Sequence, residues 1–336
     1  MASTWRDVFL ALTALGMLSF STAETREECD YGREPGYWVN DKFTLFNPAC
    51  NLQPILDKVL SLERRGSDLG DLQQAKVLTI GDSLDRKLVS SLTEELGREM
   101  DYYTPFKYKM LSSGRMKPEQ TGKSARVTVG PIEFANFFIF GAGDYKEYHS
   151  LFYEAAAIPE LHNTTSERIC KDAPKFTKPF MPEGPDMLIL ASNFWDVARW
   201  WEQGNAKTGI LRELADQFMK DFMASMDRAK KCFPHAQLYC VRTHPVLATD
   251  ERNPQYASKR PHVVAAVNSA VREAAAEKGW CLIDLDLLTS GKTNEQQWMP
   301  DGLHPSNFVM REYGNLALNT LYQATKWKVP RATGPN

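Results

Sequence analysis

The feature that most constrains the fold is a short apolar run that leads through Gly-Asp-Ser into an amphipathic segment. Residues 77–80 have the pattern of a buried strand, and apolar residues recur at helical spacing over residues 84–96. Gly81, Asp82 and Ser83 are therefore expected to form a strand-to-helix turn. A serine there has its hydroxyl at the carboxyl edge of a sheet and its N–H among the unpaired donors of a helix N-terminus, where developing negative charge is stabilised. This position suits a nucleophile, and the alternative is that Asp82 and Ser83 only cap the helix.

A second motif near the other end of the chain supplies a base. Asp301 precedes His304 by three residues in a loop bounded by Pro300 and Pro305. The spacing allows the aspartate to fold back onto the imidazole and fix its tautomer, while the other ring nitrogen faces a serine. His244 is a rival base because it also follows an expected strand, but no aspartate lies three residues before it.

In these two motifs the sequence resembles the SGNH or GDSL-type hydrolase superfamily, and within it the PC-esterases and the trichome-birefringence-like polysaccharide O-acetyltransferases. Both closer groups carry Gly-Asp-Ser with an arginine three residues on, here Arg86, and both end in Asp-x-x-His. The resemblance implies an acyl-enzyme on Ser83, with His304 as the base and Asp301 as its orienter.

The resemblance also implies donors for an oxyanion, in addition to the N–H of Ser83. In the superfamily a glycine after the second core strand offers its N–H, which makes Gly141 the candidate here, although a simple turn explains it equally well. The usual asparagine of Gly-x-Asn-Asp is replaced by Trp195. Asn193, two residues earlier, and Arg86 are the substitutes, and a fixed guanidinium suits an oxyanion.

Aromatic residues follow the expected strand over residues 186–191. The segment resembles the PC-esterase pattern of a strand followed by Trp-Asp-x-x-Arg. Trp195 and Trp200 are candidates for a sugar-stacking platform, with a place in the core as the alternative.

The N-terminal residues indicate entry into the secretory pathway. An apolar run over residues 8–20 followed by Ser-Thr-Ala predicts a signal peptide over residues 1–23, and an uncleaved signal anchor in the Golgi is the alternative. The mature protein is then expected outside the cell or in the Golgi or ER lumen. Asn163 begins a glycosylation sequon, Asn-Thr-Thr, which fits the same compartment.

Six cysteines are consistent with disulfides, but fifteen pairings are open to them. The segment from Cys29 to Cys50 resembles the start of the trichome-birefringence-like domain through its Gly-Tyr-Trp-Val. The resemblance implies a Cys29–Cys50 bridge across an irregular N-terminal flap, within residues 24–74.

The rest of the pattern predicts an α/β fold. Strand-like segments at 125–130, 134–140, 186–191, 237–243 and 280–285 alternate with helical segments at 210–230 and 262–278, with a further strand at 106–110 and a proline-rich surface loop at 171–185. We expect a three-layer, doubly wound parallel sheet that forms one domain over residues 24–330 and binds its ligand at the carboxyl ends of the strands.

The charges argue against a polyanionic partner. The chain has 40 basic and 42 acidic residues, and neither sign is gathered into a block. Nothing therefore favours nucleic acid or an anionic membrane, and a neutral partner is expected. The resemblance implies that this partner is a carbohydrate or a small acyl ester. No zinc-type cysteine or histidine cluster and no completed dinucleotide motif is present, so neither a metal nor a cofactor is expected.

Three functions follow from an acyl-enzyme on this scaffold. Water as acceptor gives an O-acetylesterase, which is the favoured prediction. A sugar hydroxyl as acceptor gives a polysaccharide O-acetyltransferase, and a silent site leaves a carbohydrate-binding protein.

Overall fold

The computed structural model describes residues 29–66, 74–103, 124–144, 163–191, 194–202, 212–245 and 261–325. The signal peptide over residues 1–23, the strand at 106–110 and Asn193 lie outside these residues. The boundaries of a single domain over residues 24–330 stay a prediction. Among the described residues, no helix is long and apolar enough to cross a membrane.

The centre of the fold is a seven-stranded sheet in the order β4-β5-β6-β3-β7-β8-β9. Five neighbouring strands are parallel: β6 (Ile132–Phe138), β3 (Ala75–Gly81), β7 (Met187–Leu190), β8 (Leu238–Arg242) and β9 (Cys281–Ile283). The expected doubly wound parallel sheet is therefore confirmed for this part of the molecule.

One edge of the sheet departs from that prediction. β5 (Ser124–Val129) runs antiparallel to β6, and β4 (Asp101–Tyr103) runs antiparallel to β5. Only Gly130 and Pro131 connect β5 to β6, with Gly130 at φ +57°. A two-residue connection can join only antiparallel strands, because a parallel pair needs a crossover.

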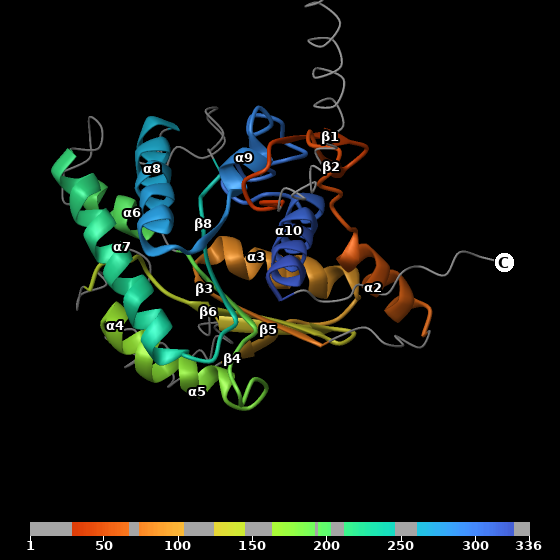
Figure 1. Ribbon diagram of the computed structural model, residues 1–336, viewed down its shortest axis with the longest axis horizontal. Coiled ribbons are helices and arrows are strands. Elements are labelled where there is room, and N and C mark those ends of the chain that lie inside the picture. Colours follow the sequence, from red (N-terminus) through yellow and green to blue (C-terminus); the bar gives the residue numbers. More distant parts are fainter. Residues whose placement is uncertain are drawn as a thin grey trace, which may run out of the picture.

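Helices cover both faces of the sheet and give the expected three layers (Figure 1). Helices α2 (Ile55–Arg64), α3 (Ser83–Glu95) and α10 (Asn307–Thr325) share one apolar cluster, with α9 (Leu285–Thr289) at its edge. Helices α5 (Ala173–Thr177), α7 (Arg212–Cys232) and α8 (Pro261–Lys278) share the other, with α6 (Phe194–Glu202) beside them. All four residues of β7 are buried, which is why that strand has a continuous apolar sequence.

The strand order places a topological switch point at β3. Its neighbours are β6 on one side and β7 on the other. In open α/β sheets, ligands bind outside the carboxyl ends of the strands at such a point. Gly81, the last residue of β3, therefore leads directly into the favoured ligand position.

The N-terminal flap is more regular than expected. β1 (Gly36–Val39) and β2 (Lys42–Leu45) form an antiparallel hairpin. Asn40 and Asp41 connect them with φ values of 46° and 60°. Two positive φ angles define the turn that suits a tight hairpin, and Asn and Asp tolerate that conformation. The expected Cys29–Cys50 disulfide is confirmed.

The flap is anchored to the sheet and to the C-terminal part of the chain. The N–H of Asp284 donates to the carbonyl of Gly32 at 2.8 Å, just after β9. A Cβ atom on Gly32 would collide with the carbonyl of Leu282 in that strand. Trp38 donates its Nε1–H to the carbonyl of Leu288 at 2.8 Å. The flap is therefore packed against the end of β9 through Gly32 and against α9 through Trp38.

The proline-rich segment 171–185 is not simply a surface loop. Its first residues form a π-helical turn (Arg168–Asp172) that continues into α5. Pro174 is the second residue of α5, and Phe176 is buried. Cys170 near the start of this segment is bonded to Cys232, and a third disulfide joins Cys240 to Cys281.

Candidate active site

The turn after β3 presents Ser83 as the first residue of α3. Asp82 is the N-cap: its Oδ1 accepts from the N–H of Leu84 at 3.0 Å, and Asp85 Oδ2 accepts from the N–H of Asp82 at 3.2 Å. This reciprocal pair satisfies two of the donors that a helix start leaves open. Capping is therefore done by Asp82 and Asp85, and the hydroxyl of Ser83 bonds elsewhere.

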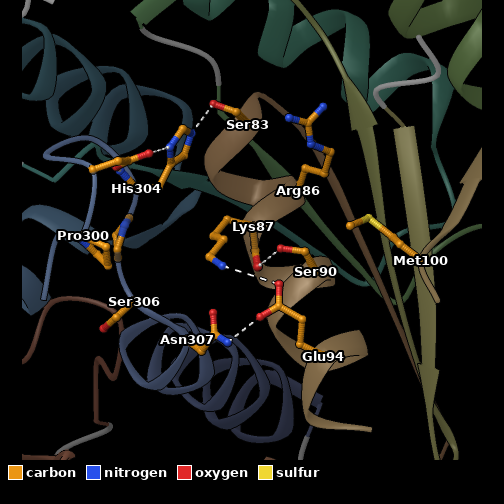
Figure 2. A pocket seen from close by; sticks show the side chains of 12 residues that line it. Ser83, Arg86, Lys87, Ser90, Glu94, Met100, Pro300, His304, Ser306 and Asn307 are labelled. Carbon is orange, nitrogen blue, oxygen red and sulfur yellow. Dashed lines mark hydrogen bonds and ion pairs between the residues drawn. The ribbon is translucent and has the colours of Figure 1, made fainter. Parts of the chain in front are cut away.

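The structure brings Ser83, His304 and Asp301 into one hydrogen-bonded chain (Figure 2). His304 Nε2 lies 2.8 Å from Ser83 Oγ, and His304 Nδ1 lies 2.7 Å from Asp301 Oδ2. Asp301 Oδ1 also accepts from the backbone N–H of His304 at 2.7 Å and of Leu303 at 2.9 Å. The loop thus holds the carboxylate and the imidazole in a fixed relation.

The charge of Asp301 fixes the tautomer of His304. Partial burial raises the pKa of Asp301, but the hydrogen bonds from His304 and Leu303 and the histidine charge outweigh it, so the pKa lies well below its ordinary value. An ionised carboxylate only accepts hydrogen bonds. His304 Nδ1 therefore carries the proton, and Nε2 is left to accept the proton of the Ser83 hydroxyl.

A buried ionic cluster that the sequence patterns did not reveal lies beneath this turn. Arg242, at the end of β8, is fully buried and donates to both oxygens of Asp85 at 2.9 and 2.7 Å and to Asp82 Oδ1 at 3.3 Å. Tyr313 of α10 donates its hydroxyl to Asp85 Oδ1 at 3.1 Å. An arginine in an otherwise apolar strand was the available signal. The cluster ties the turn that carries Ser83 to β8 and α10.

Burial and charge act in opposite directions within this cluster. Burial raises the pKa of Asp82, Arg242 lowers it and Asp85 raises it again, with a net upward shift. For Arg242, burial lowers the pKa, but the two carboxylates outweigh burial and hold the guanidinium charged. Removing one partner of such a buried pair leaves an uncompensated charge, which costs roughly 3 to 5 kcal/mol.

His244, the rival base, is placed in the core. Its ring is stacked on Phe194, and its Nδ1 lies 2.9 Å from the carbonyl of Pro245. Its backbone exchanges two hydrogen bonds with the amide of Asn268, at 2.8 and 2.7 Å. These contacts give His244 a structural role, whereas His304 is the histidine in contact with Ser83.

The first candidate oxyanion donor besides Ser83 is Gly141. Gly141 follows β6 with φ +97°, and a Cβ there would lie 2.7 Å from the carboxylate of Asp196. Asp196 accepts from the N–H groups of Ala142 at 2.7 Å and Gly143 at 3.3 Å. Backbone conformation and close packing thus explain the glycine, and its role as a donor stays a prediction.

Arg86 lies one helical turn after Ser83, and both residues line a pocket that also contains His304. Its guanidinium lies over the ring of Phe138, 5.4 Å from the centroid. In Figure 2 the guanidinium is on the opposite side of Ser83 from His304. Of the side-chain donors considered, Arg86 is the one that the structure places beside the serine.

The two candidate tryptophans, Trp200 and Trp195, differ in burial. Trp200 is 3% exposed and packs edge-on against Phe218, so it belongs to the core and the sugar-platform prediction is wrong for it. Val197, one helical turn before it in α6, is buried in the same apolar cluster. Trp195 is half-buried and packs edge-on against Phe140, at 4.9 Å between ring centroids. It also approaches Phe138, the ring beneath Arg86.

Asn163 precedes the short helix α4 (Thr165–Glu167). Its Nδ2 donates to Asp172 Oδ2 at 2.8 Å. The hydroxyl of Thr165, the third residue of the sequon, donates to the carbonyls of Gly141 and Gly143. Glycosylation of Asn163 stays a prediction.

A pocket of about 620 Å³ opens beside Ser83 and His304. It extends along α3 to Glu94 and is closed on the other side by residues 300–307. Most of the residues that line it are polar or charged, and the apolar ones are Met100, Pro300 and Pro305. Among the described residues, no group of three histidines, cysteines or acidic residues could hold a metal ion.

No protein-family model and no curated protein matches this sequence. Solved structures give low similarities. A GDSL-like lipase from Parabacteroides merdae is 15% identical over 77% of this chain and 99% of its own, with a TM-score of 0.40. The acetyl xylan esterase AlAXEase is 16% identical over 73% and 98% (TM-score 0.38), and a peptidoglycan O-acetylesterase is 12% identical over 82% and 97% (TM-score 0.42).

Proposed function

We propose that this protein is a secretory-pathway serine esterase that removes short acyl groups, chiefly acetyl, from the hydroxyls of a carbohydrate. The observation that carries the proposal is the hydrogen-bonded chain from Ser83 through His304 to Asp301 at the mouth of a polar pocket. The likeness of this constellation, with Arg86, to the PC-esterase motifs supports it.

The geometry supports acylation of Ser83 as the first half of the reaction. His304 Nε2 takes the hydroxyl proton as Ser83 Oγ attacks the ester carbonyl carbon, and Asp301 stabilises the imidazolium that forms. The tetrahedral intermediate collapses, the C–O bond to the sugar breaks, and His304 gives the proton to the departing sugar oxygen. The acetyl group is then bonded to Ser83.

Water completes the cycle by the same groups in reverse. His304 removes a proton from water, the hydroxide oxygen attacks the acyl carbon, and the bond to Ser83 Oγ breaks. Acetate leaves, and the proton returns from His304 to the serine. No oxidant, reductant or further co-reactant is needed.

The oxyanion of both intermediates is assigned to the Ser83 N–H and Arg86, with Gly141 and Asn193 as further candidates. The Ser83 N–H lies at the start of α3, and Arg86, whose guanidinium lies over Phe138, supplies a positive charge in the wall of the same pocket. A donor of this kind typically contributes about 10²- to 10³-fold to turnover.

The residues in the pocket wall favour an ester of a short acyl group with an alcohol that carries further hydroxyl groups, such as a sugar. A long acyl chain requires an apolar channel, because it cannot satisfy the polar groups that it would cover. The lysine, serine, glutamate and asparagine side chains along α3 and α10 can instead bond sugar hydroxyls. The three disulfides fit folding in an oxidising compartment.

In the test, the purified protein is given an acetylated oligosaccharide whose acetyl groups are labelled, together with an unacetylated glycan. The measurement follows the label into free acetate and into the glycan. We expect label in free acetate, and loss of that release in Ser83→Ala. Label mainly on the glycan would replace the esterase with an O-acetyltransferase. No turnover together with glycan binding would leave the carbohydrate-binding protein.

A further inference from the structure

We infer that the far end of the pocket is a binding subsite for a neutral sugar residue on the leaving-group side of the ester. The subsite consists of Lys87, Ser90 and Glu94 on α3 and Asn307 at the start of α10. This inference rests on the proposed esterase function and specifies its substrate.

The subsite follows from the helical periodicity of α3. Lys87, Ser90 and Glu94 lie four, seven and eleven residues after Ser83 and therefore form one stripe that starts at the nucleophile. At 1.5 Å per residue, the stripe extends about 16 Å along the helix. Figure 2 shows these side chains along the α3 wall of the pocket, below Ser83 and His304. An acetyl group occupies only the first part of such a length.

The direction of the stripe matches the departing group. His304 protonates the oxygen that leaves, so the alcohol must lie beside the loop that carries His304. That loop continues through Pro305 and Ser306 to Asn307, all of which line the pocket. The alcohol side of the ester therefore faces the subsite, and Arg86 lies on the other side of Ser83.

The side chains of the subsite are held in place by one another. Asn307 Oδ1 accepts from the hydroxyl of Ser91 at 3.0 Å, and its Nδ2 donates to Glu94 Oε2 at 2.7 Å. Lys87 Nζ lies 3.8 Å from Glu94 Oε1. The side chain of Glu94 is 58% exposed, so its carboxylate also faces solvent. A ligand therefore meets an ordered carboxylate, ammonium and amide.

This mixture of groups selects for neutral hydroxyls. Each sugar hydroxyl both donates and accepts, so vicinal hydroxyls can bond the carboxylate and the neighbouring ammonium together. The charges of Lys87 and Glu94 cancel, so the subsite has no net positive charge with which to attract an acidic sugar. An alkyl chain would cover all of these groups without bonding them.

The main experiment compares two esters in Glu94→Ala: an acetylated xylo-oligosaccharide, which reaches the subsite, and p-nitrophenyl acetate, which does not extend along it. We expect kcat/KM for the oligosaccharide to fall about tenfold or more, mainly through KM, as for the loss of a hydrogen bond to a charged group. The fall for the small ester should be clearly smaller. The exposed Glu99, outside the pocket, supplies the matched control Glu99→Ala, which should change neither value more than twofold.

Equal losses on the two esters would overturn the subsite, since Glu94 would then act on the chemistry or the fold. Faster hydrolysis of an acetylated oligogalacturonide than of the neutral oligosaccharide by the wild type would overturn its neutral character. Glu94→Gln, which keeps the shape and removes the charge, is the second variant if Glu94→Ala does not fold.

A binding measurement separates this inference from the proposed function. Ser83→Ala should bind the acetylated xylo-oligosaccharide in titration calorimetry, and the Ser83→Ala/Glu94→Ala protein should bind it about tenfold more weakly. Equal binding by the two proteins would reject the subsite even if Ser83-dependent esterase activity is found. Weaker binding without any esterase activity would reject the proposed function and keep the subsite.

Discussion

The indole ring of Trp38 lies edge-on against that of Trp298, with 4.5 Å between the ring centroids. Trp38 belongs to the β1–β2 hairpin, and Trp298 precedes the loop that carries Asp301 and His304. Trp38 also packs against Phe308, which follows that loop, at 5.7 Å. The N-terminal hairpin therefore braces both ends of the histidine loop and makes Trp38 a positioning residue.

Trp38→Ala should lower kcat for p-nitrophenyl acetate by roughly 10- to 100-fold, because a small displacement of the base is costly. The free energy of unfolding should also fall, so the midpoint of urea unfolding is measured beside the kinetics. Tyr37 is 45% exposed on the other face of the same strand, which makes Tyr37→Ala the matched control. Normal kcat in a destabilised Trp38→Ala protein would reject the positioning role.

Ser83→Ala and His304→Ala should each lower esterase turnover by at least about 10³-fold, because each removes a member of the proposed Ser83–His304–Asp301 unit. The thermal midpoint should change by only a few degrees, since neither side chain is part of the core. His244→Ala should show the opposite pattern, a large loss of stability from its buried site. If the His304→Ala protein is more active than the His244→Ala protein at an equal folded fraction, the base must be reassigned to His244.

Arg86→Met should lower kcat by about 10²- to 10³-fold with a small change in KM, because an oxyanion donor acts mainly in the transition state. Arg86→Lys keeps the charge and should recover part of the loss. Steady-state kinetics on p-nitrophenyl acetate distinguish these outcomes. A rise in KM alone would assign Arg86 to substrate binding.

The double variant Cys29→Ser/Cys50→Ser should lower the free energy of unfolding by roughly 2 to 4 kcal/mol, because the bridge restricts the unfolded chain. Urea unfolding of the wild type and the variant gives the difference. Mass mapping of unreduced peptides should recover the residues 29 and 50 in one linked pair, and a free Cys29 thiol would contradict the bridge.

Glu312 should make the protein less stable as the pH rises. Burial raises its pKa from 4.5 to about 7, with Lys42 opposing this shift and Asp57 adding to it. The folded protein thus holds this proton more tightly than the unfolded chain, so the contribution of Glu312 to stability is fully present below about pH 4.5 and is lost as the pH rises through about 7.

Glu312→Gln removes this titration. Relative to the wild type, its free energy of unfolding should increase between pH 4.5 and pH 8 by up to on the order of 3 kcal/mol. Urea unfolding of both proteins at the two pH values gives the difference. An unchanged or decreasing difference would show that Glu312 is ionised at little cost.

The sequence predicted the parts of the site that depend on local patterns. Ser83 lies in a strand-to-helix turn, and Asp301 contacts His304 within one short loop. Both motifs can therefore be recognised from the spacing of residues in the sequence. The Arg242–Asp85 pair was missed because its members are 157 residues apart and meet only through the order of the strands. Trp200 was misjudged because one tryptophan in an amphipathic helix does not reveal which face the sheet covers.

The strand directions at the sheet edge show the same limit. The apolar pattern located β5 and β6 within a few residues, but antiparallel pairing depends on the two-residue turn at Gly130 and Pro131. The hairpin in the flap likewise depends on the positive φ angles of Asn40 and Asp41. The composition of the flap does not reveal these backbone angles.

The position of the Gly32 backbone beside β9 has a consequence for aggregation. β9 is the last strand of the sheet, and an uncovered edge strand is a template on which other chains can add strands. Gly32 lies against that edge, and the Cys29–Cys50 bridge closes the loop that contains it. The flap thus guards the sheet against self-association, and chains with this bridge reduced would be lost first to aggregates rather than to soluble unfolded monomers.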